Sequence, residues 1–172
     1  APAMDTVERL AGARPRSAVA PHYVVTDEAH AAWAALGVAY VQAAERRIRP
    51  GRADGVSHLG QKGPHGLVHL TRTVRFDPRP QRRGHHTDES GRVLRRCFDQ
   101  GLPAVIDTHR INYTGPWAAD AARELDELLG TADRAGARYL TTPELGDAVT
   151  AVRDPLVVAD GQGHESRAGV SI

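Results

Sequence analysis

Several side-chain types that enzymes use for proton transfer and charge stabilisation occur close together near position 109. An apolar, strand-like run at residues 104–106 is followed by Asp107, His109, Arg110 and Asn112. In an extended chain Asp107 and His109 point to the same face, so the carboxylate would hold the imidazole in one tautomer and raise its basicity. A general acid or base requires both effects. The alternative interpretation is a hydrogen-bonded cluster that only closes the end of the strand.

The elements that must position these side chains alternate between strands and helices. Strands are predicted at residues 17–23, 38–41, 67–76, 104–108 and 138–140, and helices at 4–13, 26–36, 88–100, 117–129 and 143–152. Residues 45–66 and 77–87 are rich in glycine, proline and arginine and are predicted to be loops. This order is typical of right-handed βαβ units, so the predicted fold class is α/β with a parallel sheet.

Polar side chains follow these strands at the edge where ligands bind in parallel α/β folds. They are His22 and Tyr23 after the first strand, Gln42 after the second, Arg72 and Arg75 toward the end of the third, Asp107 to Asn112 at the fourth, and Thr141 and Thr142 at the fifth. Because the carboxyl ends of parallel strands meet at one edge, we expect His109, Tyr23 and Arg75 to open into a shared hollow.

Four short stretches, with a helix and Leu36–Val38 after the first, carry a resemblance to a known family. They are Ser17–Tyr23, Arg72–Pro78, Ala104–Arg110 and Tyr139–Leu145. Together they resemble the later part of polysaccharide-deacetylase-like proteins, which belong to the glycoside hydrolase/deacetylase (β/α)-barrel group. The similarity spans roughly residues 15–150, and the segment around His109 is its most specific part. The resemblance implies parallel βα units that form part of a (β/α) barrel of the polysaccharide-deacetylase type.

The resemblance also implies roles for individual residues. In that family a motif with proline and tyrosine shapes the substrate groove and helps hold the oxyanion, and a late histidine acts as the general acid. Pro21 and Tyr23 match the first motif and His109 matches the second, with Asp107 as the group that orients His109. The residues expected to contact the substrate are His22, Tyr23, Arg72, Arg75, Arg110 and Asn112.

A divalent metal ion, expected to be Zn²⁺, is a further implication of the resemblance. The family's ligands come from an Asp-Asp pair and a His-x-x-x-His motif that should precede Ser17 and have no counterpart there, so no ligand is identified in this chain. His65 and His69 have the His-x-x-x-His spacing but follow the Pro21–Tyr23 motif. In a strand their imidazoles would lie ~13 Å apart, too far for bonds near 2 Å to one zinc ion. His30, on a predicted helix, is expected to bind no ligand.

The length bears on domain organisation. A (β/α) barrel needs about 250 residues, whereas this chain has 172. We expect residues 1–152 to form a partial (β/α)-barrel domain and residues 153–172 an irregular C-terminal tail. Either the chain is the carboxyl-terminal portion of a longer protein, or a second copy completes it. We favour the first, because the missing motifs and strands lie on the same side, and unpaired edge strands would promote self-association.

Composition excludes several classes of partner. The 22 Lys+Arg and 21 Asp+Glu leave a net charge of +1, which gives no electrostatic reason to expect nucleic acid. No apolar run approaches the ~20 residues that cross a bilayer, so no membrane partner is predicted. The first residues lack the features of a secretory signal, which leaves the localisation open. Cys97 is the only cysteine, which excludes an internal disulfide, and its apolar neighbours predict a buried thiol.

Two functions follow from these observations. The leading hypothesis is a metal-dependent hydrolase of acylated carbohydrate, of the polysaccharide-deacetylase type, in which His109 protonates the leaving amine or alkoxide. In this hypothesis Tyr23, Arg75 or Arg110 contacts the oxyanion or the sugar. The alternative is a non-catalytic carbohydrate-binding or structural barrel module, in which the strand-end cluster grips sugar hydroxyls and Trp33 or Trp117 stacks on sugar rings.

Overall fold

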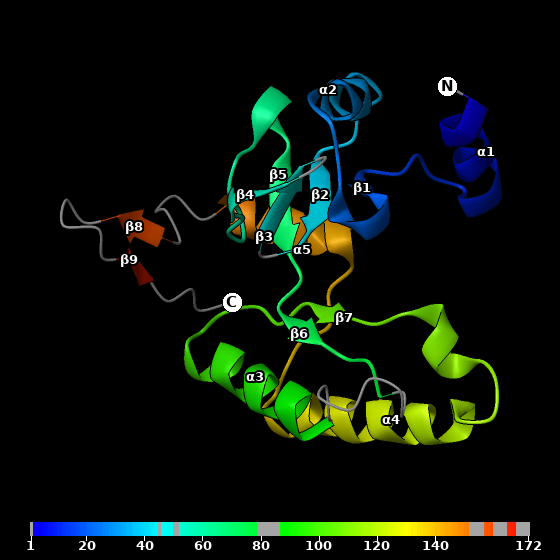
Figure 1. Ribbon diagram of the computed structural model, residues 1–172, viewed down its shortest axis with the longest axis vertical. Coiled ribbons are helices and arrows are strands. Elements are labelled where there is room, and N and C mark those ends of the chain that lie inside the picture. The colour runs from blue at the N-terminus through cyan, green and yellow to red at the C-terminus, as the bar shows by residue number, and fades with distance from the viewer. Residues whose placement is uncertain are drawn as a thin grey trace. The chain divides into compact units, whose positions relative to one another are not determined.

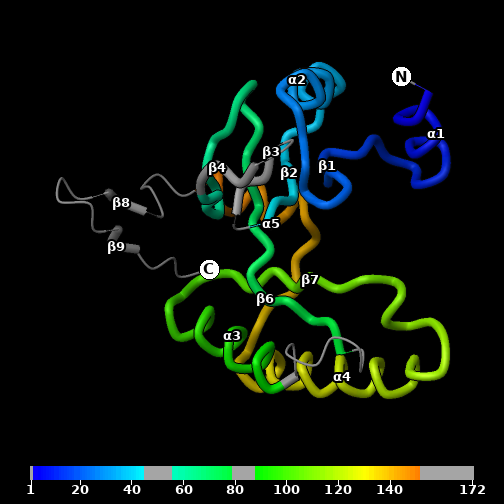
Figure 2. The backbone as a smooth tube through the Cα atoms, viewed as in Figure 1, coloured from blue at the N-terminus to red at the C-terminus, as the bar shows by residue number. Residues whose placement is uncertain are grey.

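The chain forms two compact units, each with its own hydrophobic core. The computed structural model describes residues 2–44, 46–49, 52–78, 87–151, 157–159 and 165–167. Unit 1 combines the described parts of residues 1–71 and 140–168, and unit 2 combines those of residues 72–139. The backbone leaves unit 1 after Thr71 and returns to it at Leu140 (Figure 2).

Unit 1 is built on a three-stranded parallel sheet (Figure 1). Its strands are β1 (Ser17–Val19), β2 (Tyr40–Ala43) and β5 (Val68–Thr71). β2 is the central strand, where Tyr40 pairs with Ser17 on one side and with Val68 on the other. The parallel pairing confirms the predicted α/β class with a parallel sheet.

The helices of unit 1 begin and end at signals that are present in the sequence. They are α1 (Pro2–Ala11), α2 (Asp27–Ala35) and α5 (Thr142–Ala151). The Thr26 hydroxyl accepts a hydrogen bond from the Ala29 amide at 3.3 Å and caps α2. Gly37 follows α2 with a φ of 86°, a left-handed conformation that glycine adopts at little cost. At the start of α5, the Glu144 carboxylate accepts a hydrogen bond from the Thr141 amide at 2.7 Å, as in a capping box.

Alternation along β2 directs its side chains to two different helices. Val41 packs into an apolar cluster with side chains of α2. The Gln42 amide nitrogen donates a hydrogen bond to the Thr142 hydroxyl of α5 at 2.9 Å. The ring of Tyr40 lies directly against Gly146 of α5. Because successive strand side chains point to opposite faces, α2 and α5 cover opposite faces of the sheet.

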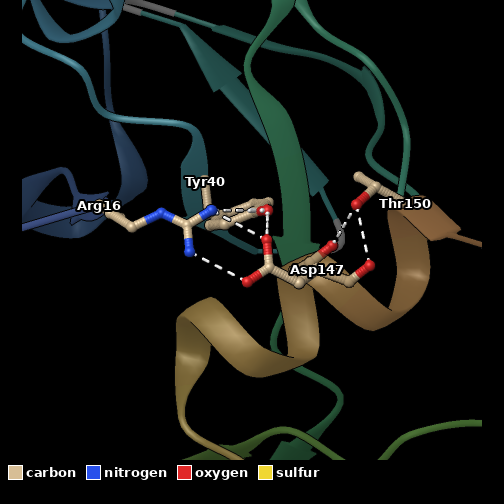
Figure 3. Close-up of polar contacts among 5 residues, drawn as sticks. Arg16, Tyr40, Asp147 and Thr150 are labelled. Atoms are coloured by element: carbon tan, nitrogen blue, oxygen red, sulfur yellow. Dashed lines mark hydrogen bonds and ion pairs between the residues drawn. The ribbon is translucent and has the colours of Figure 1, made fainter.

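A polar cluster ties the chain before β1 to β2 and α5 (Figure 3). The two terminal guanidinium nitrogens of Arg16 donate to the Asp147 carboxylate at 2.8 and 2.9 Å, and the Tyr40 hydroxyl donates to it at 2.5 Å. These hydrogen bonds lower the pKa of Asp147 from 3.8 to about 2, and those from Arg16 are the larger cause. On the next turn, Thr150 donates to the carbonyl oxygen of Gly146 at 2.8 Å.

Unit 2 packs helices against a two-stranded parallel sheet. Its elements are β6 (Val74–Arg75), β7 (Ile106–Asp107), α3 (Thr87–Asp99) and α4 (Ala118–Arg134). α3 and α4 lie side by side (Figure 1). Val74 and Ile106 pair across the sheet and pack into a core with side chains of both helices. Arg75 and Asp107, the next pair along, therefore point to the other face. Cys97 of α3 is buried, as predicted.

Two predictions of irregular structure were wrong. Residues 45–66, predicted to be a loop, contain the antiparallel pair β3 (Arg46–Arg49) and β4 (Arg52–Val56). Residues 153–172, predicted to be an irregular tail, contain the antiparallel pair β8 (Val157–Ala159) and β9 (Glu165–Arg167). Pairing of backbone N–H and C=O groups across a hairpin does not require apolar side chains, so polar composition was a poor guide. The predicted loop at 77–87 lies largely outside the described residues.

Two predicted strands also differ from the structure. The single strand expected at residues 67–76 is divided into β5 and β6, which belong to different units. Residues 138–140, expected to form the last strand, are not paired in a sheet. Three residues of suitable composition do not form a strand unless a neighbouring strand is available to pair with them.

The described residues establish a mixed α/β fold with parallel strands. Their strands form small separate sheets, so the finer expectation of a partial barrel remains a proposal. Among the described helices, none is both long enough and apolar enough to cross a membrane.

Candidate functional site

His109 lies directly after the parallel strand β7, in the loop that leads into the short 3₁₀ helix η4 (Arg110–Tyr113). The side chains of His109 and Arg110 are both exposed to solvent. The backbone carbonyl of His109 accepts a hydrogen bond from the Asn112 amide at 2.9 Å, which closes the turn. An exposed imidazole at the carboxyl end of a parallel strand is placed where a substrate can reach it.

Asn112 anchors this loop from within unit 2. Its side chain is fully buried, at 0% exposure, and its amide nitrogen donates to the Phe76 carbonyl at 3.2 Å and to the Thr108 hydroxyl at 3.0 Å. The Thr108 hydroxyl also lies 3.0 Å from that of Tyr113. The prediction that Asn112 contacts the substrate stays a prediction. In the structure its buried side chain holds the His109 loop against the core.

Asp107 forms an ion pair with Arg72 on the face of the β6–β7 sheet that points away from the core. Both side chains are largely shielded, at 18% exposure for Arg72 and 16% for Asp107. The prediction that Asp107 orients His109 stays a prediction. Arg75 pairs with Asp107 in the strand register and is exposed, and its backbone carbonyl accepts a hydrogen bond from Ser90 at 2.6 Å.

His22 and Tyr23, the two residues predicted from the first strand, lie in unit 1. They belong to the 3₁₀ turn η1 (Pro21–Tyr23) that follows β1, and their φ values are 53° and 60°. Two consecutive non-glycine residues in the left-handed region indicate strain, which concentrates at functional sites. His22 is exposed, whereas Tyr23 is part of the lining of a pocket.

That pocket is contained in unit 1 and has a volume of about 220 Å³. Its lining comes from the turn after β1, the start of α2, the end of β2, the segment around the 3₁₀ turn η2 (Pro64–Gly66), and β5. The residues are Ala20, Tyr23, Val25, Asp27, His30, Val41, Gln42, Ala43, Ala44, Ser57, Gln61, Lys62, Gly63, Pro64 and His69. The pocket therefore opens beside the carboxyl ends of β1 and β2, where ligands of parallel α/β folds bind.

Two buried imidazoles contact each other in the wall of this pocket. The rings of His30 and His69 have centroids 6.1 Å apart in an edge-to-face arrangement, and each residue is 6% exposed. Gly63 makes room for one of them, because a Cβ there would lie 2.9 Å from the Cδ2 atom of His69. Sequence reasoning assigned no ligand role to His30. The strand register explains the position of His69. His69 pairs with Val41, which faces α2, so the His69 side chain also points toward α2, where His30 lies.

The zinc ion that the resemblance implies stays a prediction, and the described residues do not identify its ligands. Among them, no group of three His, Cys, Asp or Glu side chains is placed to hold a metal ion. His65 lies in η2, is exposed and has a φ of 59°, whereas His69 is buried in β5. The ~13 Å separation expected for two strand residues therefore does not apply to this pair, because His65 is not in a strand.

The structure thus groups the predicted site residues by unit. Arg72, Arg75, Asp107, His109 and Arg110 belong to unit 2, and His22 and Tyr23 belong to unit 1. The predicted hollow shared by residues of both sets stays a prediction. Trp33 packs against the apolar cluster of unit 1, which favours a core role over sugar stacking.

Comparisons of the chain with protein-family models, with curated proteins and with solved structures found no match, so the functional assignment rests on the residues of the site.

Proposed function

We propose that this chain is part of a hydrolase that removes acyl groups from carbohydrate, of the polysaccharide-deacetylase type, and that its parallel βα units are part of a (β/α) barrel. The observation that carries the proposal is the exposed imidazole of His109 on an anchored loop after a parallel strand. The sequence resemblance around this residue supports the same assignment.

In the proposed reaction, His109 acts as the general acid. When the tetrahedral intermediate collapses, the bond between the acyl carbon and the leaving nitrogen or oxygen breaks, and the His109 imidazolium gives its proton to the departing atom. The buried hydrogen bonds of Asn112 support this role, because a catalytic group must be held in place by a rigid surrounding structure.

The substrate-side groups of the proposal are the exposed guanidinium groups of Arg75 and Arg110, which belong to unit 2 as His109 does. Each can donate a hydrogen bond to a sugar hydroxyl or to an oxyanion. A divalent metal remains part of the proposal by resemblance alone, because no ligand group for it is found among the described residues.

The test is release of acetate from N-acetylglucosamine oligomers by the complete natural protein, with and without a chelator. Replacing His109 with alanine should lower kcat by about 10²–10⁴-fold, the usual contribution of a general acid. The loss should be much smaller for 4-nitrophenyl acetate, because its leaving group departs without a proton. Loss of folding would instead reduce both activities together.

His65→Asn is the matched control, because His65 is also exposed and does not belong to the proposed site. Its φ of 59° is one that asparagine tolerates. Unchanged acetate release by His109→Ala would remove the assigned acid. Binding of the oligomers without turnover by the natural protein would favour the alternative, a carbohydrate-binding module.

A further inference from the structure

The pocket of unit 1 has a lining that matches an uncharged ligand with many hydroxyl groups. The imidazoles of His30 and His69 and the hydroxyl of Ser57 belong to groups that can donate and accept hydrogen bonds, as a hydroxyl-rich ligand requires. The side-chain oxygen of Gln61 accepts a hydrogen bond from the His58 amide at 3.1 Å, so Gln61 adds an amide donor. The two formally charged lining residues, Asp27 and Lys62, have opposite signs and are both exposed. The lining therefore carries no net charge that would select an ion.

Ser57 points to a missing hydrogen-bond partner in this lining. Its residue is 2% exposed, and its hydroxyl has no hydrogen-bond partner among the described residues. A buried hydroxyl left without a partner is costly, and native structures almost always satisfy such groups with protein, water or ligand. A ligand hydroxyl in the pocket would supply the bond.

The volume of the pocket and the apolar part of its lining limit the class of ligand further. The volume of about 220 Å³ lies below the roughly 300–1,000 Å³ of pockets that hold drug-sized ligands, yet far above the roughly 30 Å³ of one water. Val25, Val41, Ala43 and Pro64 supply apolar surface, which suits the C–H face of a saturated ring. A volume of this size accommodates one ring within the pocket itself.

We propose that this pocket binds a single uncharged, polyhydroxylated ring, such as one sugar residue. The ring would lie with the two imidazoles on one side and the end of β2 on the other. The inference goes beyond the proposed hydrolysis, because every lining residue belongs to unit 1 and His109 does not contribute. It assigns a binding role to His30 and Ser57, which the proposed reaction does not use.

The test is an amide chemical-shift titration of the full chain with glucose, N-acetylglucosamine and myo-inositol. We expect saturable shifts confined to amides that line the pocket, with dissociation constants in the millimolar range. Ser57→Ala should weaken binding by about threefold to tenfold, because it removes one hydrogen bond. Ala44→Leu should abolish the shifts by filling the pocket from its partly exposed rim.

Ala32→Leu is the matched control, since Ala32 is exposed on α2 and does not line the pocket. This control should bind as the unaltered chain does, and equal melting temperatures for both leucine variants would show that Ala44→Leu is folded. The proposal is overturned if no sugar or inositol shifts these amides at tens of millimolar. It is also overturned if acetate or inorganic phosphate binds better, or if Ala44→Leu binds normally.

Binding and hydrolysis fail independently in these experiments. Sugar binding without acetate release would support the binding pocket and contradict the proposed hydrolase. Acetate release without shifts of the pocket amides would support the hydrolase and contradict the binding pocket.

Discussion

The Tyr40 hydroxyl lies 2.5 Å from Oδ1 of Asp147, and so joins the central strand of unit 1 to its last helix. The same carboxylate accepts two hydrogen bonds from Arg16. Tyr40 is 4% exposed, and its ring rests on Gly146, one residue before Asp147. One short segment of α5 is therefore fixed both by packing and by charge.

The Asp147 carboxylate makes unit 1 sensitive to acid. The pKa of Asp147 is lowered from 3.8 to about 2, so its contribution to stability is complete above pH 3.8 and is lost as the pH falls through about 2. Asp147→Asn should melt below the unaltered protein at neutral pH, and this difference should shrink between pH 4 and pH 2. Thermal melts across this range check the effect. Carboxyl-carbon NMR should give a titration midpoint near pH 2 for Asp147 and a higher midpoint in Tyr40→Phe. A midpoint unchanged in Tyr40→Phe would contradict the contribution assigned to the Tyr40 hydroxyl.

Gly146 is required by the packing of Tyr40. A Cβ at position 146 would overlap the phenol ring, which is buried and cannot move aside, so Gly146→Ala should destabilise the protein by about 1–3 kcal/mol. Gly130→Ala in α4 is the matched control, because its Cβ would meet only the flexible end of Arg134 at 3.4 Å. Helix propensity should make that variant more stable by up to about 1 kcal/mol. Urea denaturation measures both, and equal effects would refute the packing argument.

Asn112 should act as a positioning residue for His109. Asn112→Ala removes the hydrogen bonds to Phe76 and Thr108 and should cost about 1–3 kcal/mol, because it leaves a buried carbonyl without a partner. If the proposed hydrolysis is correct, kcat should fall more than KM changes, and amide substrates should suffer more than activated esters. Equal losses on both substrates would indicate a purely structural role.

The ion pair between Arg72 and Asp107 should couple the two residues energetically. Both are largely shielded, so Arg72→Leu should cost about 1–3 kcal/mol, less than for a fully buried pair. Asp107→Asn in the Arg72→Leu background should lower the stability little further, because the ion pair of the Asp107 carboxylate is already absent. A double-mutant cycle by urea denaturation should give a coupling energy of about 0.5–3 kcal/mol. Additive effects would show that the contact does not stabilise unit 2.

The sequence predicted the helices better than the strands, for a physical reason. Thr26 and Gly37 mark the two ends of α2 through local hydrogen bonding and a local backbone conformation, which short stretches of sequence encode. A strand depends on a distant partner, and residues 138–140 have the composition of a strand without the partner. The hairpin of β3 and β4 was missed because pairing of backbone groups overrode its polar composition.

The candidate site was predicted in part for the same reason. The position of His109 after a parallel strand followed from local sequence, whereas the burial of Asn112 depends on the carbonyl of Phe76, 36 residues away. The contact between His30 and His69 joins a helix to a strand in the wall of the pocket, and the local sequence around either residue does not predict it.

The insertion of unit 2 between β5 and α5 constrains the order in which the protein can assemble during synthesis. Arg16 meets Asp147 across a separation of 131 residues, so the first half of unit 1 must leave the ribosome and wait. Residues 72–139 of unit 2 are made during that delay and can fold before α5 emerges. Until then, the face of β2 that carries Tyr40 lacks the helix that packs against it, so we expect it to be exposed on the nascent chain during this interval.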